Sequence, residues 1–324
     1  MQESIEYKIK RADANDIHVI ASLASIVGKN SARRYAEISE KFARSISGPG
    51  FIGYIAYAQN VDQAPPIEPT PAAYYGIFLG LVNLGGREIL AGQSGDTMTH
   101  PDHRGKGLFV RLAEITYQTA KQEGVEFVYG IPNSASHHGF AKRLNWKFPF
   151  KMRTKNIFVP TIPVGLLRRR YGNRPLGFGS YSRKLLELLF NTETPDGILG
   201  NRGRSENGCI RDTHSWTHDR LRLVCIRHRH TGIILKYDGD LGIGEISGEP
   251  SKGEVISIVV RLLIVAILLG SIRIKSFFSP ETPLEMAFSK VGGISESMWF
   301  GYLKLAGDDD PSMLKLSYFD YDTY

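Results

Sequence analysis

A glycine-rich basic turn between an apolar strand and an amphipathic helix is the feature that most constrains this chain. The turn has the sequence Pro-Asp-His-Arg-Gly-Lys-Gly at residues 101–107. The first N–H groups of a helix lack partners within the helix and lie at the positive end of its dipole, so such a turn attracts phosphate. Gly105 and Gly107 allow backbone conformations that side chains disfavour, and Arg104 and Lys106 add positive charge. The pattern therefore predicts a phosphate site at the start of the helix.

Two common nucleotide motifs are excluded by the residues of this turn. A nucleotide P-loop needs a Lys-Ser/Thr pair after its second glycine, and none is present. A dinucleotide fingerprint needs a third glycine and an acidic residue about 20 positions further on, and both are missing. The turn instead resembles motif A of the GNAT superfamily of N-acetyltransferases, Arg/Gln-x-x-Gly-x-Gly/Ala, through Arg104 and Gly107. Phe109 departs from that motif, and its ring either packs beneath the helix or crowds the pyrophosphate.

The hydrophobic periodicity predicts an order of elements that is similar to the order in this family. A cap cluster at residues 13–16 predicts the start of the first helix. Strands are expected at 7–12, 51–58, 73–82, 88–99, 125–130 and 151–159, and further helices at 31–46, 110–124 and 136–144. The resemblance covers about residues 5–159 and implies an α/β (α+β) GNAT fold, in which helices flank a central, mixed, mostly antiparallel and splayed sheet.

The C-terminal half is predicted to be a degenerate GNAT-like copy of the first domain, because its elements repeat the same order without the basic turn. Strands are expected at 233–237, 241–247, 271–278 and 298–305, and a helix at 283–291, while a separate helix at 182–190 is expected in the region that connects the two copies. We expect a catalytic domain at 1–159, a basic Pro/Gly-rich connecting region at 160–215 and the degenerate domain at 216–324. The second domain would cover the first sheet, shape the acceptor pocket or form a homodimer.

The most apolar stretch of the chain, residues 255–270, is predicted to be a buried strand-to-helix segment. A membrane span needs about 20 uninterrupted apolar residues, and this run is shorter and carries Arg261 near its middle. The polar start of the chain does not resemble a signal peptide, and two cysteines fit a reducing compartment. The chain is therefore expected to be cytoplasmic and to have no membrane span.

Positive charge is concentrated in the middle of the chain, where residues 151–230 hold sixteen Lys or Arg and six Asp or Glu. This excess accounts for the net charge of +7. An anionic small substrate and a plain solvated surface both remain open. Nucleic acid is disfavoured because no recognition helix or aromatic-interleaved motif is evident. No metal site is expected either, because Cys209, His214, His218 and Cys225 lack a close Cys-x-x-Cys pair.

The resemblance implies that acetyl-CoA, the acyl donor, binds along the strand and the turn. In relatives the strand before the turn is splayed from its neighbour, and the pantetheine arm lies in that gap. The implied coenzyme-binding residues on this strand and turn are Thr97, Met98, Thr99, Arg104, Gly105, Lys106, Gly107, Leu108 and Phe109. Asn133 and Ser134 would bond the pantetheine amides and Phe140 would pack on the arm, although each is equally explained as a turn residue or a core aromatic.

The resemblance also implies direct acetyl transfer to an amine, with no covalent enzyme intermediate. A backbone N–H near Met98 would stabilise the oxyanion. Asp96 is the candidate base, with a local capping role as the alternative. Relatives often use a tyrosine as the acid, but Ala141 holds that position here, so His138 or His137 would substitute unless both are surface histidines.

The predicted acceptor is the primary amine of a nucleotide-linked amino sugar. This rests on the basic middle region and on segments 129–134 and 139–146, which look like a subgroup from bacterial surface-polysaccharide gene clusters. Two alternatives stay open. One is a tRNA-dependent aminoacyltransferase of the tandem kind, and the other is a non-catalytic coenzyme-binding or interaction module.

Overall fold

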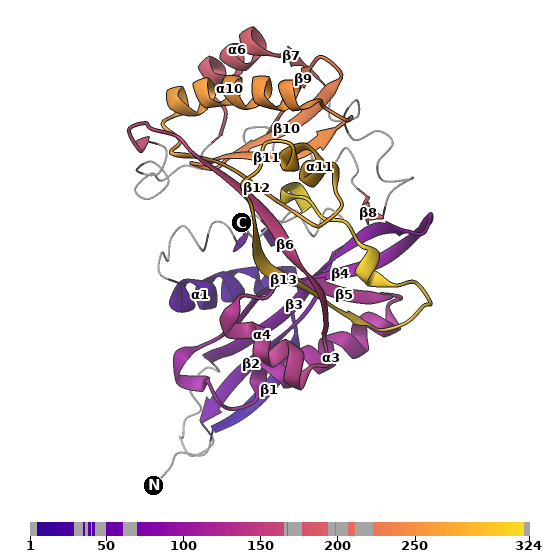
Figure 1. Ribbon diagram of the computed structural model, residues 1–324. Helices are drawn as coiled ribbons and strands as arrows, with labels where there is room; N and C mark the ends of the chain where they lie inside the picture. Colours follow the sequence, from indigo (N-terminus) through magenta and orange to yellow (C-terminus); the bar gives the residue numbers. More distant parts are fainter. Residues whose placement is uncertain are drawn as a thin grey trace.

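The computed structural model describes residues 5–28, 35, 38, 39, 41, 42, 50–60, 70–164, 167, 177–193, 198, 207–210 and 223–320. Its strands form one sheet in the order β1-β2-β3-β4-β5-β13-β6-β12-β11-β10-β9-β7, and the short β8, Gly208–Cys209, pairs with β3 at the side. Figure 1 shows this sheet passing through two lobes, one formed by the first strands of the chain and one by later strands.

The N-terminal lobe is an antiparallel sheet that gains one parallel strand. The antiparallel strands are β1 Ile5–Arg11, β2 Phe51–Asn60, β3 Thr70–Leu84 and β4 Arg87–Thr99. A two-residue turn joins β3 to β4, and both of its glycines, Gly85 and Gly86, have the positive φ that such hairpins need. The chain then crosses over through α3 Leu108–Gln122 to β5 Phe127–Gly130, which pairs parallel to β4.

Helices cover both faces of this sheet. α1 Ile17–Val27 packs against the face that carries Tyr74 of β3, whereas α3 packs against the opposite face, which carries Tyr75. Consecutive strand residues point to opposite faces, so these two neighbouring tyrosines belong to separate cores. α4 Ser134–Arg143 lies on the α3 face and contributes Phe140 to that core.

The C-terminal lobe repeats the same succession of elements. Its hairpin strands are β10 Thr231–Tyr237 and β11 Leu241–Ser247, with β9 Leu223–His228 and β7 Asn191–Thr192 beyond them. α10 Lys252–Leu269 crosses over to β12 Arg273–Phe278, which is parallel to β11, and α11 Pro283–Ser289 and β13 Ile294–Lys304 follow. α6 Ser180–Leu189 packs beside α10.

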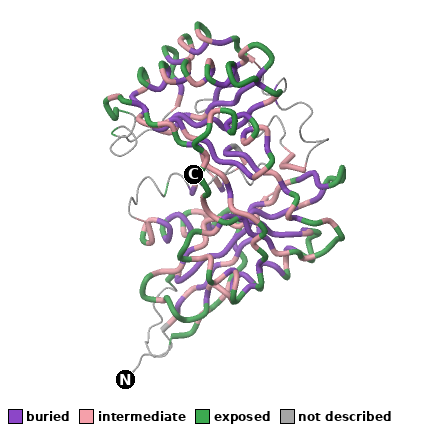
Figure 2. Tube along the Cα trace, viewed as in Figure 1, coloured by how far each residue is buried: buried purple, intermediate pink, exposed green. Residues whose placement is uncertain are grey.

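The last strand of each half completes the sheet of the other half. β13 lies between β5 and β6 Lys147–Phe158 and is antiparallel to both, while β6 pairs antiparallel with β12. The sheet therefore continues from one lobe to the other, and Figure 2 shows buried residues along the trace in both lobes. The division of the chain at residues 159 and 216 stays a prediction.

Most of the predicted elements are confirmed, with ends that differ by a few residues. The expected helix at 31–46 lies mostly outside the described residues, although residues 35, 38, 39, 41 and 42 are helical. The strand expected within residues 255–270 is wrong, because that run belongs to the single helix α10. A continuous apolar run carries no periodicity that separates a strand from a buried helix.

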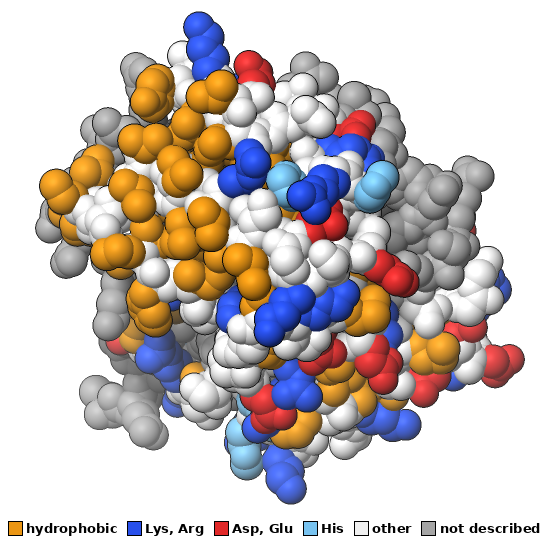
Figure 3. Space-filling view, turned by 45° about the horizontal axis from the view of Figure 1, so that its top comes forward, with side chains coloured by type: hydrophobic (Ala, Val, Ile, Leu, Met, Phe, Trp, Pro, Cys, Tyr) orange, Lys and Arg blue, Asp and Glu red, His pale blue; other side chains and the backbone are white. Residues whose placement is uncertain are grey.

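α10 also differs from a fully buried helix, because one side of it is apolar and exposed. Ile256, Val260, Ile264, Ile267 and Leu268 are each between 42% and 51% exposed and recur at helical spacing. Figure 3 shows hydrophobic side chains gathered on this end of the molecule. No helix among the described residues is long and apolar enough to cross a membrane.

Candidate active site

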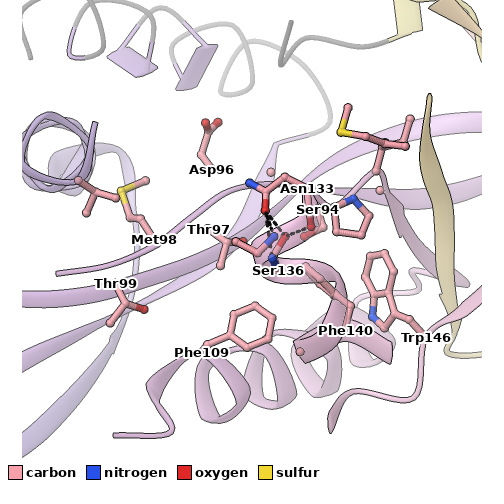
Figure 4. A pocket seen from close by; sticks show the side chains of 18 of the residues that line it. Ser94, Asp96, Thr97, Met98, Thr99, Phe109, Asn133, Ser136, Phe140 and Trp146 are labelled. Carbon is pink, nitrogen blue, oxygen red and sulfur yellow. Dashed lines mark hydrogen bonds between the residues drawn. The ribbon is translucent and has the colours of Figure 1, made fainter. Parts of the chain in front are cut away.

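The two central parallel strands of the N-terminal lobe separate where a cavity opens. β4 and β5 are paired only from Ala91–Phe127 to Gln93–Tyr129, although β4 continues to Thr99. The cavity has a volume of about 1010 Å³ and is lined by residues of β4, the basic turn, the end of β5, α4 and the segments beside them. The expected splay of the strands is therefore present (Figure 4).

A β-bulge on β4 re-aims the side chains at this opening. Gly76 of β3 pairs with Gly95, but Tyr74 pairs with Met98, so β4 has one residue more than β3 over this stretch. Asp96 takes up the extra residue with a φ of +54°, a left-handed conformation that only a few non-glycine residues adopt. Because of the bulge, Ser94 faces Tyr75 and the α3 core, whereas Asp96 faces the α1 side.

The Asp96 carboxylate is buried and paired with a lysine. Its side chain is 3% exposed and lies 2.9 Å from the Lys41 Nζ atom, which is itself 4.1 Å from the centre of the Phe78 ring. The pKa of the nearby Tyr74 hydroxyl is raised well above its usual value, mainly by burial and further by the charge of Asp96. The candidate base therefore lines the cavity as a carboxylate held beside a cation.

The register of β4 indicates which backbone N–H groups face the cavity. The His100 N–H donates to the Ala72 carbonyl at 2.8 Å, and alternate residues of an antiparallel strand bond to the same neighbour. The N–H of Met98, paired with Tyr74, therefore also points toward β3. The N–H of Thr99 points the opposite way, toward the opening. The N–H of Met98 itself is therefore engaged with β3, and the predicted oxyanion donor near Met98 stays a prediction.

The basic turn has the geometry that its glycines predict. Gly105 and Gly107 both have a φ of +74°, and Gly107 is the N-cap of α3 without a side-chain cap of the first N–H groups. Arg104, Gly105, Lys106 and Gly107 are exposed, and Arg104 also lines the cavity. Leu108 is buried in the α3 core, where it anchors the start of the helix.

An aromatic wall forms the α3 side of the cavity. The Phe109 ring lies 5.1 Å from Phe140 and 5.8 Å from Tyr75, and Phe140 lies 4.4 Å from Trp146, all measured between ring centres. A Cβ atom on Gly139 would come within 2.9 Å of the Phe109 ring. Phe109 therefore packs beneath its helix while its ring also lines the cavity, and Gly139 makes room for it.

The remaining predicted residues lie at or beyond the edge of the cavity. Asn133 lines it and caps α4 by accepting from the N–H groups of Ala135 and Ser136. Ser134 and His138 are exposed residues of α4 that do not line the cavity, and Ala141 does not line it either. In the close-up of the cavity in Figure 4, Asp96 lies apart from Thr97, Thr99 and Phe109, which lie toward α3.

Sequence reasoning missed several lining residues. Ser94, Ser136, Gly139 and Trp146 lie in or beside the motifs but carry no pattern that distinguishes them from turn or core residues. Met298 comes from β13, about 200 positions along the chain from Ser94, so no local signal could have placed it here. The second half thus contributes a side chain to the cavity.

Metal-binding residue types do not gather around the cavity. Within the part of the chain that the structure describes, no group of three or more His, Cys, Asp or Glu side chains is placed to hold a metal ion. Cys209 and Cys225 form no disulfide with each other, and His214 and His218 lie outside the described residues, as does the Arg168–Arg170 run.

Comparison with known families identifies one domain. Residues 72–148 match the model of the acetyltransferase (GNAT) domain, a stretch that runs from β3 to the start of β6 and includes the turn and most of the cavity. This domain match agrees with the predicted enzyme class, an N-acetyltransferase. No curated protein sequence matches the chain.

Solved structures share the fold of nearly the whole chain. A GCN5-related N-acetyltransferase from Kribbella flavida is 12% identical with a TM-score of 0.53, and covers 92% of this chain and 71% of its own. A GCN5-related N-acetyltransferase from Anabaena variabilis is 13% identical with a TM-score of 0.54, and the alignment covers 93% of this chain and 73% of that protein. A glucosamine N-acetyltransferase region of a fungal multi-domain β-N-acetylglucosaminidase is 12% identical with a TM-score of 0.53, with 93% and 38% covered. The predicted fold is therefore confirmed.

Proposed function

We propose that this chain transfers an acetyl group directly from acetyl-CoA to a primary amine in the β4–β5 cavity. The observation that carries the proposal is the continuity of that cavity with the basic turn at the uncapped start of α3. A coenzyme thioester needs an anion site for its phosphates and an open strand edge for its amides, and both are present side by side. The bound coenzyme would supply the activated acetyl group.

The turn would hold the phosphates of the coenzyme. Arg104 and Lys106 are exposed and form no ion pair with other described residues, so both charges are available to a ligand. The N–H groups that follow Gly107 add the helix dipole to these charges. The Oδ1 atom of Asn133 is used in capping α4, which leaves its amide N–H groups for the carbonyl oxygens of the arm.

Asp96 would accept the proton that the amine loses as it attacks. Its place on the bulge and in the lining of the cavity supports this role. The Thr99 N–H, which points toward the opening near the turn, would donate to a carbonyl oxygen of the pantetheine arm. We do not propose His138 as the general acid, because its side chain does not line the cavity.

For the acceptor we propose an amino sugar, carried on a nucleotide. Support comes from the resemblance of segments 129–134 and 139–146 to polysaccharide-cluster enzymes and from the excess of positive charge in the middle of the chain. The glucosamine substrate in the name of the fungal relative concerns that protein, and we extend it to this chain only as part of the proposal. A cytoplasmic location and a homodimer are further predictions.

Calorimetric titration with acetyl-CoA tests the donor site. We expect the native protein to bind and the Arg104→Ala variant to bind about 10- to 100-fold more weakly, because it loses a charge-assisted hydrogen bond to phosphate. Arg143→Ala is the matched control, since this exposed arginine of α4 lies outside the cavity and should leave affinity unchanged. A panel of amines, including uridine-diphosphate amino sugars, then tests the acceptor by release of free thiol.

The other outcomes distinguish the alternatives. No binding to the native protein would overturn the proposal, and a ribonuclease-sensitive copurifying RNA would then point to the aminoacyl-transfer alternative. Binding without turnover over the whole panel would support a non-catalytic coenzyme-binding module. Turnover with simple polyamines in place of amino sugars would retain the reaction and reject the acceptor.

A further inference from the structure

Four side chains form a continuous chain of hydrogen bonds beneath the cavity. The Trp146 Nε1–H donates to the Tyr117 hydroxyl at 3.1 Å, the Tyr117 and Tyr75 hydroxyls lie 2.6 Å apart, and the Tyr75 hydroxyl lies 3.0 Å from Ser94 Oγ. Tyr117 comes from α3, Tyr75 from β3 and Ser94 from β4. The chain therefore links the helix layer to the strand edge that borders the cavity.

The chemistry of its first member fixes the direction of this chain. An indole N–H can only donate, and a tyrosine hydroxyl has one hydrogen to give. Among the described residues, the Tyr117 and Tyr75 hydroxyls have no hydrogen-bond partner outside this chain of four side chains, and both residues are buried. If Tyr75 donated to Tyr117, the buried Tyr117 hydrogen would have no acceptor, which is costly. Tyr117 therefore donates to Tyr75, and Tyr75 donates to Ser94.

This direction leaves the Ser94 hydroxyl hydrogen with no acceptor inside the chain. Within the described part of the protein, Ser94 Oγ has no hydrogen-bond partner other than Tyr75. Ser94 lines the cavity, so its hydrogen has the cavity as the place to find an acceptor. The three residues behind it thus make Ser94 a hydrogen-bond donor with a set orientation.

Ser94 stands at the closed end of the opening between the strands. It follows Gln93, the last residue of β4 that pairs with β5, and lies against Gly130, where an added Cβ would be 3.5 Å from the Ser94 Cβ. The basic turn is at the opposite end, beyond Thr99. A ligand whose phosphates sit at the turn therefore extends its far end, which in acetyl-CoA is the thioester, toward Ser94.

We propose that the Ser94 hydroxyl donates a hydrogen bond to the thioester carbonyl oxygen, and that Trp146, Tyr117 and Tyr75 are positioning residues for it. The inference rests on the proposed function. No proton is transferred along the chain, since an indole cannot replace one that left. Burial raises the pKa of both tyrosine hydroxyls, so they stay protonated as donors.

Steady-state kinetics of three variants test this inference. Ser94→Ala should lower kcat roughly 100-fold, the effect of losing one donor to a developing oxyanion, while the Kd of free CoA stays the same. Ser94→Thr keeps the hydroxyl and should restore most of the rate. Tyr117→Phe removes no cavity atom but frees Tyr75 to accept from Ser94, so it should also lower kcat with the Kd of CoA unchanged.

Tyr54→Phe is the matched control. The hydroxyl of Tyr54, on β2, bonds to Thr119 of α3, the helix that also carries Tyr117, at 2.8 Å. It is not part of the hydrogen-bonded chain that reaches the cavity, so kcat should stay at the native value. If Ser94→Ala keeps the native kcat, or if Tyr54→Phe loses as much as Tyr117→Phe, the inference is overturned. If the native protein does not bind acetyl-CoA at all, the proposed function is overturned instead.

Discussion

The two halves of the molecule share a topology but differ at the start of the crossover helix. The N-cap of α3 is Gly107, and no side chain caps the first N–H groups of this helix. α10 begins at Ser251, whose side chain accepts from the Glu254 N–H, and Glu254 itself lies in the first turn and accepts from Thr231 at 2.8 Å. A negative side chain thus already occupies the positive end of α10. Of these two crossover helices, α3 is the one whose N-terminus is left for an external anion.

The halves also differ in what fills the space where their parallel strands part. β11 and β12 pair only at Leu241–Ile274 and Gly242–Lys275, so they separate even sooner than β4 and β5. There the Ser276 hydroxyl bonds to the Ile243 carbonyl, and Leu284 and Phe288 of α11 pack into the same core. The topology alone therefore does not make a site. In the first half, Asn133, Gly139 and Phe140 of α4 and its N-cap line a cavity, whereas Leu284 and Phe288 of α11 are buried in the core of the second half.

Both halves even carry a bulge next to an acidic residue. In β11 the register shifts between Glu245 and Ile243, as the register of β4 does around Asp96. Asp96 lines the cavity, whereas Glu245 is buried and accepts from the adjacent Ile246 N–H. This pair gives the comparison its most demanding test.

Asp96→Asn should cause the largest effect, a fall in kcat of about 100- to 10,000-fold if the carboxylate is the general base. Asparagine tolerates the left-handed conformation at this position, so the substitution changes charge without adding strain. The matched variant Glu245→Gln should leave kcat unchanged. Initial rates of thiol release at saturating acetyl-CoA and amine provide the measurement. A native kcat in Asp96→Asn would reduce Asp96 to a structural partner of Lys41.

The sequence was sufficient for the parts of this comparison that depend on local patterns. The basic turn, the strand before it and the helix after it follow from glycine positions and periodicity, which act within a few residues. The bulge at Asp96 was not predictable, since it depends on the register against β3. The place of β13 between β5 and β6 joins segments more than 130 positions apart, and Met298 reaches the cavity only through this pairing. Lys41, which is helical, meets Asp96 only through tertiary packing.

Gly107→Ala should have the next largest effect, because it forces a side chain into a φ of +74° at the uncapped end of α3. The strain of about 1–2 kcal/mol is relieved if the turn changes conformation, which would weaken acetyl-CoA binding about 10-fold. Gly292→Ala is a matched control in the second half, with a φ of +70° and, as at Gly107, open space where the Cβ would be.

Titration calorimetry and thermal unfolding of both glycine variants separate affinity from stability. Both should lose stability by similar amounts, but only Gly107→Ala should lose affinity. Equal affinities in the two variants would mean that the conformation of the turn does not matter for the coenzyme, and the anion site would have to be sought elsewhere.

Ser251→Ala should have the smallest effect, and it tests the start of the crossover helix in the second half. Removing the cap of α10 should lower the free energy of unfolding by about 1 kcal/mol, whereas Ser251→Gly should cost only a few tenths. Neither change should alter the Kd of acetyl-CoA, since the α10 terminus is occupied by Glu254 rather than by a ligand. Chemical denaturation measures the first quantity and calorimetry the second. A changed Kd would mean that the shared strands β6 and β13 transmit the state of one crossover helix to the other.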